Sequence, residues 1–296
     1  MSATTHNKGN TTGNDIGAGS AMAGTPSANP RVLNRPRVVA DAITITQRNL
    51  ITIARVPQLL VFATIQPIIF VLMFRYVFGG AYGIPGVPYV DFLMPGIFAQ
   101  TVAFGAIGTG IGLSEDLSKG LIDRFRSLPM APSAVLVGRT TADVVRNIFV
   151  QTLMVAVGVL VGFRIHNGIP NFLVAMLLLL GFGFALSWLF GLIGLALKNA
   201  ETTQAASFPI MAPLVFASAA FVDVRTMPGW LQPWARNQPL SAIITAVRRL
   251  ILNEQQAQLL GLTESTASLV LKAIAWIVGL TLVFGTLAIR KYRRVV

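Results

Sequence analysis

Long apolar runs recur along this chain, and each is close to the length of a membrane-spanning helix. A helix needs about 20 apolar residues to cross the hydrocarbon core of a bilayer. It is favoured there because it satisfies its own backbone hydrogen bonds. The pattern predicts an all-α membrane protein with six transmembrane helices, which we place near 58–78, 91–113, 144–163, 172–197, 205–222 and 268–289. Pro209 and Pro213 predict that the fifth helix is kinked or broken.

Composition supports a membrane location. Hydrophobic residues make up 54% of the chain and charged residues 11%, with a mean hydropathy of +0.68, whereas soluble domains carry about 25% charged residues. The net charge of +12 first suggests a nucleic-acid partner. Most basic residues, however, flank the apolar runs, so we expect contacts with membrane lipids and no nucleic acid. The chain has no cysteine, which excludes disulfides and thiolate metal sites.

Two polar segments precede the first apolar run. Residues 1–34 are rich in Ser, Thr, Asn and Gly and are predicted to form a disordered cytoplasmic tail, because they cannot bury enough apolar surface. Residues 36–56 place Arg48 and other basic residues opposite an apolar side that includes Ile43, as in a basic amphipathic helix on a membrane surface. An ordinary extension of the first span is the alternative. We therefore divide the chain into a tail and a transmembrane domain at 35–296.

The distribution of basic residues predicts the orientation. Arginines and lysines are commoner in cytoplasmic than in external connections of membrane proteins. If the N-terminus is cytoplasmic, most of the 23 basic residues fall in cytoplasmic segments, including the terminal cluster that begins at Arg290. We therefore expect a multi-pass protein of the cell membrane with both termini in the cytoplasm.

The most informative polar stretch is 114–129, which lies between the second and third apolar runs. Ser114 is predicted to cap a short helix with an acidic first turn. The helix would be amphipathic and of mixed charge, which favours docking into a groove of another protein over binding to lipid headgroups. A solvated turn is the alternative. The candidate contact residues are Glu115, Asp116, Lys119, Gly120, Asp123, Arg124, Arg126 and Pro129.

A second informative segment, 223–266, falls on the external side. Its tryptophans suit the headgroup level of a membrane. Residues from Leu240 to Ile251 form an apolar helical stripe, so we expect a helix that lies on or dips into the outer face. A gate over a transport path and a plain interfacial anchor are equally supported. The candidate residues here are Trp230, Trp234, Asn237, Pro239, Arg248 and Arg249.

Small residues and charges within the spans carry further information. The pairs Gly108/Gly112 and Gly158/Gly162 have the GxxxG spacing that permits close helix approach, and they could form a dimer face. The predicted spans contain no acidic residue near their middle. Because proton-coupled carriers usually need one, this weakens the hypothesis of a secondary transporter.

Catalytic signatures are missing from the sequence. The two histidines, His6 and His166, cannot build a metal cluster. There is no G-x-S-x-G motif. Gly105 to Gly110 has the spacing of a Walker motif, but Ile111 and Gly112 follow where Lys and Ser or Thr are required. We therefore expect neither an enzyme nor a nucleotide or metal site in this chain.

Several motifs together resemble a known family. They are Glu115-Asp-Leu-Ser-Lys-Gly-Leu-Ile-Asp-Arg-Phe-Arg-Ser-Leu-Pro129, Gly138-Arg-Thr-Thr-Ala-Asp143, Met227-Pro-Gly-Trp-Leu-Gln-Pro233 and Asn237-Gln-Pro-Leu-Ser241. In order and spacing they are similar to the membrane subunits of type-2 ABC transporters, in the actinobacterial daunorubicin/doxorubicin-resistance permease branch. The similarity covers roughly 45–292. Leu121 stands after Gly120 where many family members have Thr, which weakens any inference to polysaccharide exporters.

The resemblance implies a function and a set of partners. Segment 114–129 would be the coupling helix held by a separate ABC ATP-binding subunit, which would bind the ATP and magnesium. The working complex would contain two such subunits and a second permease copy or a paralogue. The cargo would be a hydrophobic drug, polyketide or lipid moved outward. A stand-alone carrier or channel remains the main alternative, and a membrane enzyme acting on lipid is a weaker one.

Overall fold

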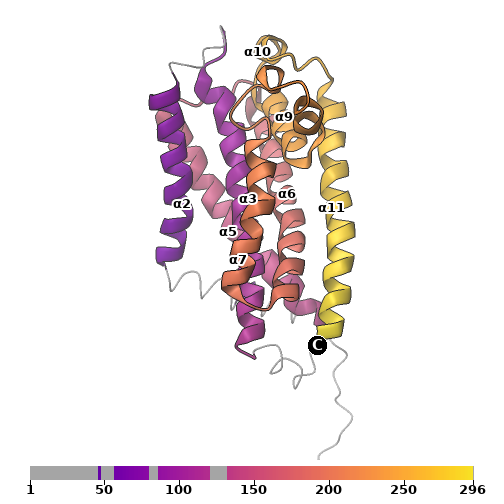
Figure 1. The fold of residues 1–296 in the computed structure, drawn as a ribbon. Helices are drawn as coiled ribbons and strands as arrows, with labels where there is room; N and C mark the ends of the chain where they lie inside the picture. The colour runs from indigo at the N-terminus through magenta and orange to yellow at the C-terminus, as the bar shows by residue number, and fades with distance from the viewer. Residues whose placement is uncertain (1–45, 48–56, 80–85, 121–131, 296) are drawn as a thin grey trace, which may run out of the picture. The chain divides into compact units, whose positions relative to one another are not determined.

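The computed structural model describes residues 46–47, 57–79, 86–120 and 132–295, all within the compact unit Arg35–Val296. The regular elements in these ranges are helices (Figure 1). The predicted tail 1–34 lies outside the described residues, and so does the predicted surface helix 36–56 apart from a helical Thr46 and Gln47. Thr46 Oγ1 donates a hydrogen bond to the Gly138 carbonyl at 3.0 Å.

Four helices of 30 residues each are long enough to cross a membrane. They are α3 (Tyr89–Ser118), α5 (Pro132–Val161), α6 (Gly168–Leu197) and α11 (Thr266–Val295). At a rise of about 1.5 Å per residue, each is about 45 Å long. Each also contains an apolar stretch of spanning length. The prediction of a helical multi-pass membrane protein is therefore confirmed.

The first and fifth predicted spans correspond to shorter helices. The first is α2 (Pro57–Leu72), which continues as the π-helix η1 (Met73–Phe78). The fifth is α7 (Ala200–Phe216), whose N-cap Asn199 accepts a hydrogen bond from the Thr202 amide at 3.0 Å. This helix passes through both of its prolines and is not broken, contrary to one form of the prediction. It ends six residues before the predicted boundary at 222.

Helix α3 lies at the centre of the packing (Figure 1). Its first half is almost wholly buried, and its closest approach is to α6. A Cβ atom on Gly110 would overlap the Phe190 carbonyl, and one on Gly194 would overlap the Gly110 carbonyl. These glycines therefore let the two backbones touch. By contrast, α11 exposes large apolar side chains such as Leu282, as a lipid-facing helix does.

Shorter helices gather at one end of the bundle. They are η2 (Val224–Thr226), α8 (Gln232–Asn237), α9 (Pro239–Ile251) and α10 (Glu254–Leu259). In Figure 1, α9 and α10 lie at the end of the bundle where α3 begins. Helix α11 ends at the other end of the bundle. The backbone amide of His166, which follows α5, bonds to the Ile251 carbonyl at 3.0 Å, so this connection is at the same end. The last turn of α3 lies at the other end.

Candidate functional site

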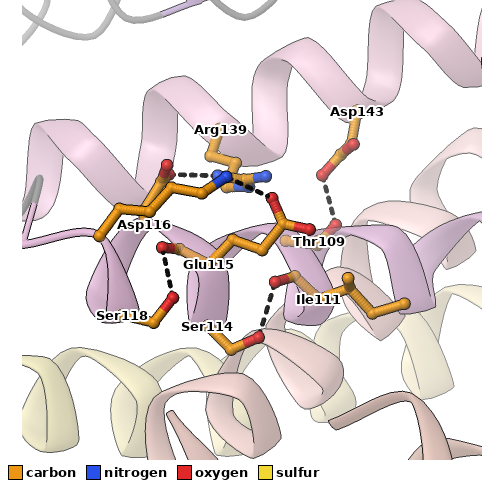
Figure 2. Close-up of polar contacts among 9 residues, drawn as sticks. Thr109, Ile111, Ser114, Glu115, Asp116, Ser118, Arg139 and Asp143 are labelled. Atoms are coloured by element: carbon orange, nitrogen blue, oxygen red, sulfur yellow. Dashed lines mark hydrogen bonds and ion pairs between the residues drawn. The ribbon is translucent and has the colours of Figure 1, made fainter. Parts of the chain in front are cut away.

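The charged segment predicted to be a separate helix begins as the last turn of α3. The prediction that Ser114 caps a new helix is wrong: Ser114 Oγ donates to the Ile111 carbonyl at 2.6 Å within an uninterrupted helix (Figure 2). The change from apolar to charged residues marks a change of environment, and the backbone continues through it. Helix α3 ends at Ser118, and Gly120 follows with a φ of +65°, which favours glycine.

The charged residues of this turn point in different directions. Glu115 forms an exposed ion pair with Lys119, with Oε2 and Nζ 3.2 Å apart. Such a surface pair contributes little to stability, so both side chains are available to a partner. Asp116 instead pairs with Arg139 at the start of α5 (Figure 2). The other predicted contact residues lie outside the described residues, namely Asp123, Arg124, Arg126 and Pro129.

A row of polar contacts continues from this turn along the interface of α3 and α5, and we call it the polar seam. Thr109 Oγ1 donates to the Asp143 carboxylate (Figure 2). Deeper in the bundle, Arg146 donates to the Gly105 carbonyl at 2.5 Å, and Gln151 Nε2 donates to the Phe98 carbonyl at 2.9 Å. The α3 residues of the seam are Phe98, Gly105, Thr109 and Asp116. They are spaced by seven, four and seven residues and therefore lie on one face of the helix. Polar groups thus tie the two helices together over most of their shared length.

Glycines of α3 make room for the arginines of the seam. A Cβ atom on Gly108 would lie 2.9 Å from Arg146 Nη1, and one on Gly112 would overlap the guanidinium of Arg139. The GxxxG face of α3 is therefore occupied by α5 of the same chain. It is not the dimer face that the spacing allowed.

The glycine pair of α5 also has roles within the chain. A Cβ atom on Gly158 would lie 2.7 Å from Cε of Met94 on α3. Gly162, with a φ of +108°, follows the end of α5. Close helix packing is therefore confirmed for Gly158, whereas Gly162 allows the helix to end. A dimer face at this pair stays a prediction.

A buried acidic side chain lies near one end of a span, whereas the expectation concerned the middle of the spans. Asp143 is buried in the apolar stretch Gly138–Val161 of α5, where Arg146 lies 3.3 Å from it. The predicted span began one residue too late to include it. Because a cation and a hydroxyl both contact this carboxylate, it is a partner in the seam.

A cleft of about 750 Å³ lies beside the seam. It is formed by residues of α2, α3, α5 and α7. Its walls are mainly apolar, as ligand sites usually are, and they also carry polar groups: Gln66, Gln100, Arg146, Asn147, Glu201 and Gln204. Arg146 belongs to both the cleft and the seam. The sequence pattern did not predict this cleft, although amides within apolar runs such as Gln100 were a signal for it.

The predicted residues near the opposite end fall into two groups. Trp230 and Trp234 are 80% and 54% exposed, as expected for side chains at a membrane interface. Asn237 Nδ2 donates to the Pro233 carbonyl at 2.9 Å, and Pro239 occupies the first turn of α9. These residues lie on the outside of the helix cluster or connect its parts.

Arg248 is buried among other helices of the bundle. It is only 4% exposed, and its guanidinium donates to the carbonyls of Phe92 and Ala220 at 3.0 and 3.2 Å. It also stacks 3.7 Å from the centre of the Phe92 ring, a favourable cation–π geometry. Arg249 instead pairs with the exposed Glu254. Helix α9 therefore packs into the bundle against α3, α6 and α11, and it does not lie on the surface. The gating hypothesis stays a prediction.

These features define the class of the protein: a multi-pass helical membrane protein whose central helix connects a charged end to a cleft. The ABC-2 type transporter family model matches residues 41–252. The chain belongs to this family. It is thus a transport subunit and not an enzyme, and the ATPase activity of such transporters resides in a separate subunit.

Named relatives support this assignment. The chain is 34% identical to the daunorubicin resistance ABC transporter permease protein DrrB1 of Streptomyces coeruleorubidus, over 88% of each protein. It is 28% identical to the probable doxorubicin resistance ABC transporter permease protein DrrC of Mycobacterium tuberculosis, over 75% of this chain and 81% of the relative. Identity to the doxorubicin resistance permease DrrB of the same organism is 31%, over 54% and 55%.

Proposed function

We propose that this chain moves a hydrophobic drug, polyketide or lipid out of the cell, driven by a separate ABC ATP-binding subunit that grips segment 114–129. The observation that carries the proposal is the continuity of α3. One unbroken helix bears the exposed Glu115 and Lys119 in its last turn and lines the cleft from Gln100 to Ile111. A displacement of the charged end therefore reaches the cleft without passing through a hinge.

The polar seam determines which elements move together. Four side-chain contacts join α3 to α5, so the two helices shift as one body when the end of α3 is displaced. The facing wall of the cleft comes from α2 and α7. Relative motion of these two walls would open and close the cleft, which is the change that alternating access requires.

The chemistry of the cleft fits an amphiphilic cargo. Apolar walls favour a cargo with a large apolar surface. Amides such as Gln100 and Asn147 offer hydrogen bonds to carbonyl or hydroxyl groups. The relatives named for resistance to daunorubicin and doxorubicin support a drug or polyketide. The proposal includes two ATP-binding subunits that hold ATP and magnesium, a second permease copy or paralogue, six crossings of the cell membrane, and both termini in the cytoplasm.

Export assays with coupling variants test the proposal. Gly120→Pro forbids the positive φ after α3, and Asp123→Lys reverses a charge in the proposed coupling segment. Both variants should abolish export from cells that express the ATP-binding subunit while the permease remains in the membrane. Normal export by both, at equal expression, contradicts the proposal.

Deleting the gene of the ATP-binding subunit tests the main alternative. A stand-alone carrier or channel would still move cargo. Among the described residues, the buried carboxylate of Asp143 near the cleft is paired with Arg146, so it does not favour this alternative. We expect the deletion to stop export as completely as the coupling variants do.

A further inference from the structure

A second cavity, of about 470 Å³, lies at the end of the bundle opposite the charged turn of α3. Its walls come from the start of α3, the segment around η2, helices α8 and α9, the connection after α10, and the first turns of α11. Four basic and two acidic side chains line it: Arg225, Arg236, Arg248, Lys272, Asp223 and Glu264. The lining therefore carries an excess of positive charge.

Two of the four basic side chains are already engaged. Arg225 Nη2 lies 2.6 Å from Asp223 Oδ2. Burial alone would raise the pKa of the Asp223 carboxyl, but side-chain and backbone hydrogen bonds from Arg225 hold this pKa below its usual value. This pair is thus ionised and self-neutralising at neutral pH. The Arg248 guanidinium is directed to two backbone carbonyls.

The other two basic side chains form no ion pair with a residue that the structure describes. Arg236 donates to the neutral Gln232 Oε1 at 3.2 Å, so its charge is not balanced by that contact. Lys272 is half-buried and makes no ion pair or hydrogen bond with any other residue that the structure describes. A half-buried ammonium costs desolvation energy unless an anion or water compensates it. The cavity therefore presents two cations without an ion pair, from α8 and α11, and the carboxylate of Glu264, which accepts a hydrogen bond from Ser268 Oγ at 3.3 Å. The positive charges outnumber this carboxylate.

The surroundings of Lys272 indicate where the anion comes from. Leu271 and Ile274, its neighbours on α11, are 65% and 42% exposed and belong to the apolar side of that helix. Trp230 and Trp234, on the connection and helix that precede α9, are side chains suited to the headgroup level. A ligand whose anionic head enters the cavity can therefore lay its apolar chains against α11.

We propose that this cavity binds the phosphate group of an anionic phospholipid, with Lys272 and Arg236 as its charge-bearing ligands. This site goes beyond the proposed transport function and is separate from the cleft that α2, α3, α5 and α7 form. Such a lipid would connect α8 to α11 at the membrane face. A free phosphate ion offers the same headgroup chemistry without the acyl chains.

Binding of short-chain phosphatidylglycerol to the detergent-solubilised full-length chain tests the proposal, with affinity followed by native mass spectrometry or a thermal shift. Lys272→Gln and Arg236→Gln should each weaken binding about tenfold, the effect of losing one charge-assisted hydrogen bond. Lys272→Arg should retain most of it. The matched control is Lys291→Gln, which removes the same charge from the far end of α11 and should leave the affinity unchanged.

Two further ligands separate the possible sources of the anion. Phosphatidylcholine should bind more weakly than phosphatidylglycerol, because it has no net negative charge. Inorganic phosphate should bind far more weakly, because it lacks the acyl chains. Inorganic phosphate binding as tightly as the lipid would overturn the lipid assignment. Equal lipid affinity in Lys272→Gln and Lys291→Gln would overturn the site itself.

Discussion

Arg139 of α5 reaches across Gly112 to pair with Asp116 in the last turn of α3. This contact is the outermost member of the polar seam and the one nearest to the proposed coupling segment. Both side chains are mostly buried, so the pair is less screened by solvent than the neighbouring Glu115–Lys119 pair. In the proposed mechanism, motion imposed on the end of α3 would reach α5 first at this pair.

Breaking this pair should uncouple transport from ATP hydrolysis. Arg139→Gln leaves the Asp116 charge partly buried without its arginine partner, which should cost about 1–3 kcal/mol of stability. We expect reduced export while ATPase activity of the complex persists. Both rates should be measured in proteoliposomes that contain the permease and its ATP-binding subunit.

Exchanging the two charges is the control for this prediction. The double variant Asp116→Arg with Arg139→Asp restores an ion pair and should recover part of the export. If the exchange is no better than Arg139→Gln alone, the pair acts in some other way than by joining the helices.

Three glycine substitutions should separate folding from coupling. Gly110→Ala places a methyl group against the Phe190 backbone, which cannot move easily, and should cost about 1–3 kcal/mol. Gly112→Ala meets only the flexible end of Arg139, so the fold should survive while the pair with Asp116 is disturbed. Gly279→Ala on α11 has open space around it and serves as the control.

Thermal unfolding in detergent and export should both be measured for these variants. Gly279→Ala should be the most stable variant, Gly112→Ala should be intermediate, and Gly110→Ala should be the least stable. Gly112→Ala should reduce export strongly while it lowers the unfolding temperature only slightly. Equal behaviour of all three variants would mean that close approach of α3 to its neighbours is unimportant.

Arg248 should be a main determinant of stability at its end of the bundle. Arg248→Met removes two hydrogen bonds to buried carbonyls and a cation–π contact, at a cost of about 2–4 kcal/mol. Arg249→Met loses only a pair with an exposed glutamate and should cost less than about 1 kcal/mol. Unfolding of the two variants in parallel gives the comparison. A larger loss for Arg249→Met would contradict the assigned contacts.

The polar groups of the cleft should govern cargo affinity. Gln100 is buried, lines the cleft, and has a side-chain oxygen without a hydrogen-bond partner among the described residues. Gln100→Leu should weaken binding of a cargo with hydroxyl or carbonyl groups about tenfold. Thr152→Val, on a part of α5 that is exposed and outside the cleft, should leave affinity unchanged. Fluorescence of daunorubicin offers a direct binding measurement.

Apolar periodicity predicted the architecture well, because crossing a bilayer constrains helix length so strongly. The four longest helices of the described residues overlap predicted spans, and three of them contain the whole predicted span. Helix ends were less predictable: Ser114 looked like a cap because charge begins there, yet α3 continues to Ser118 without a break. The burial of Arg248 was not predicted, because the backbone carbonyls that receive its hydrogen bonds lie far away in sequence, at Phe92 and Ala220.

The seam could not be predicted for a similar reason. Asp116, Asp143, Arg139 and Arg146 were all visible as charges near predicted span ends. Their pairing depends on the register of two antiparallel helices, which a single sequence does not fix. Likewise, GxxxG spacing predicts close approach but does not identify what approaches. Here it is the side chains of α5, because Gly108 and Gly112 lie under two arginines.

The central claim is that a separate ATP-binding subunit holds the end of α3, and site-specific cross-linking tests it most directly. The chain has no cysteine, so Lys119→Cys provides a single reactive position. A thiol-reactive photo-cross-linker on this residue should capture the ATP-binding subunit, with a yield that changes when ATP is added. Thr263→Cys, at the opposite end of the bundle, should give no such product. Capture of the ATP-binding subunit from position 263, and never from position 119, would contradict the account.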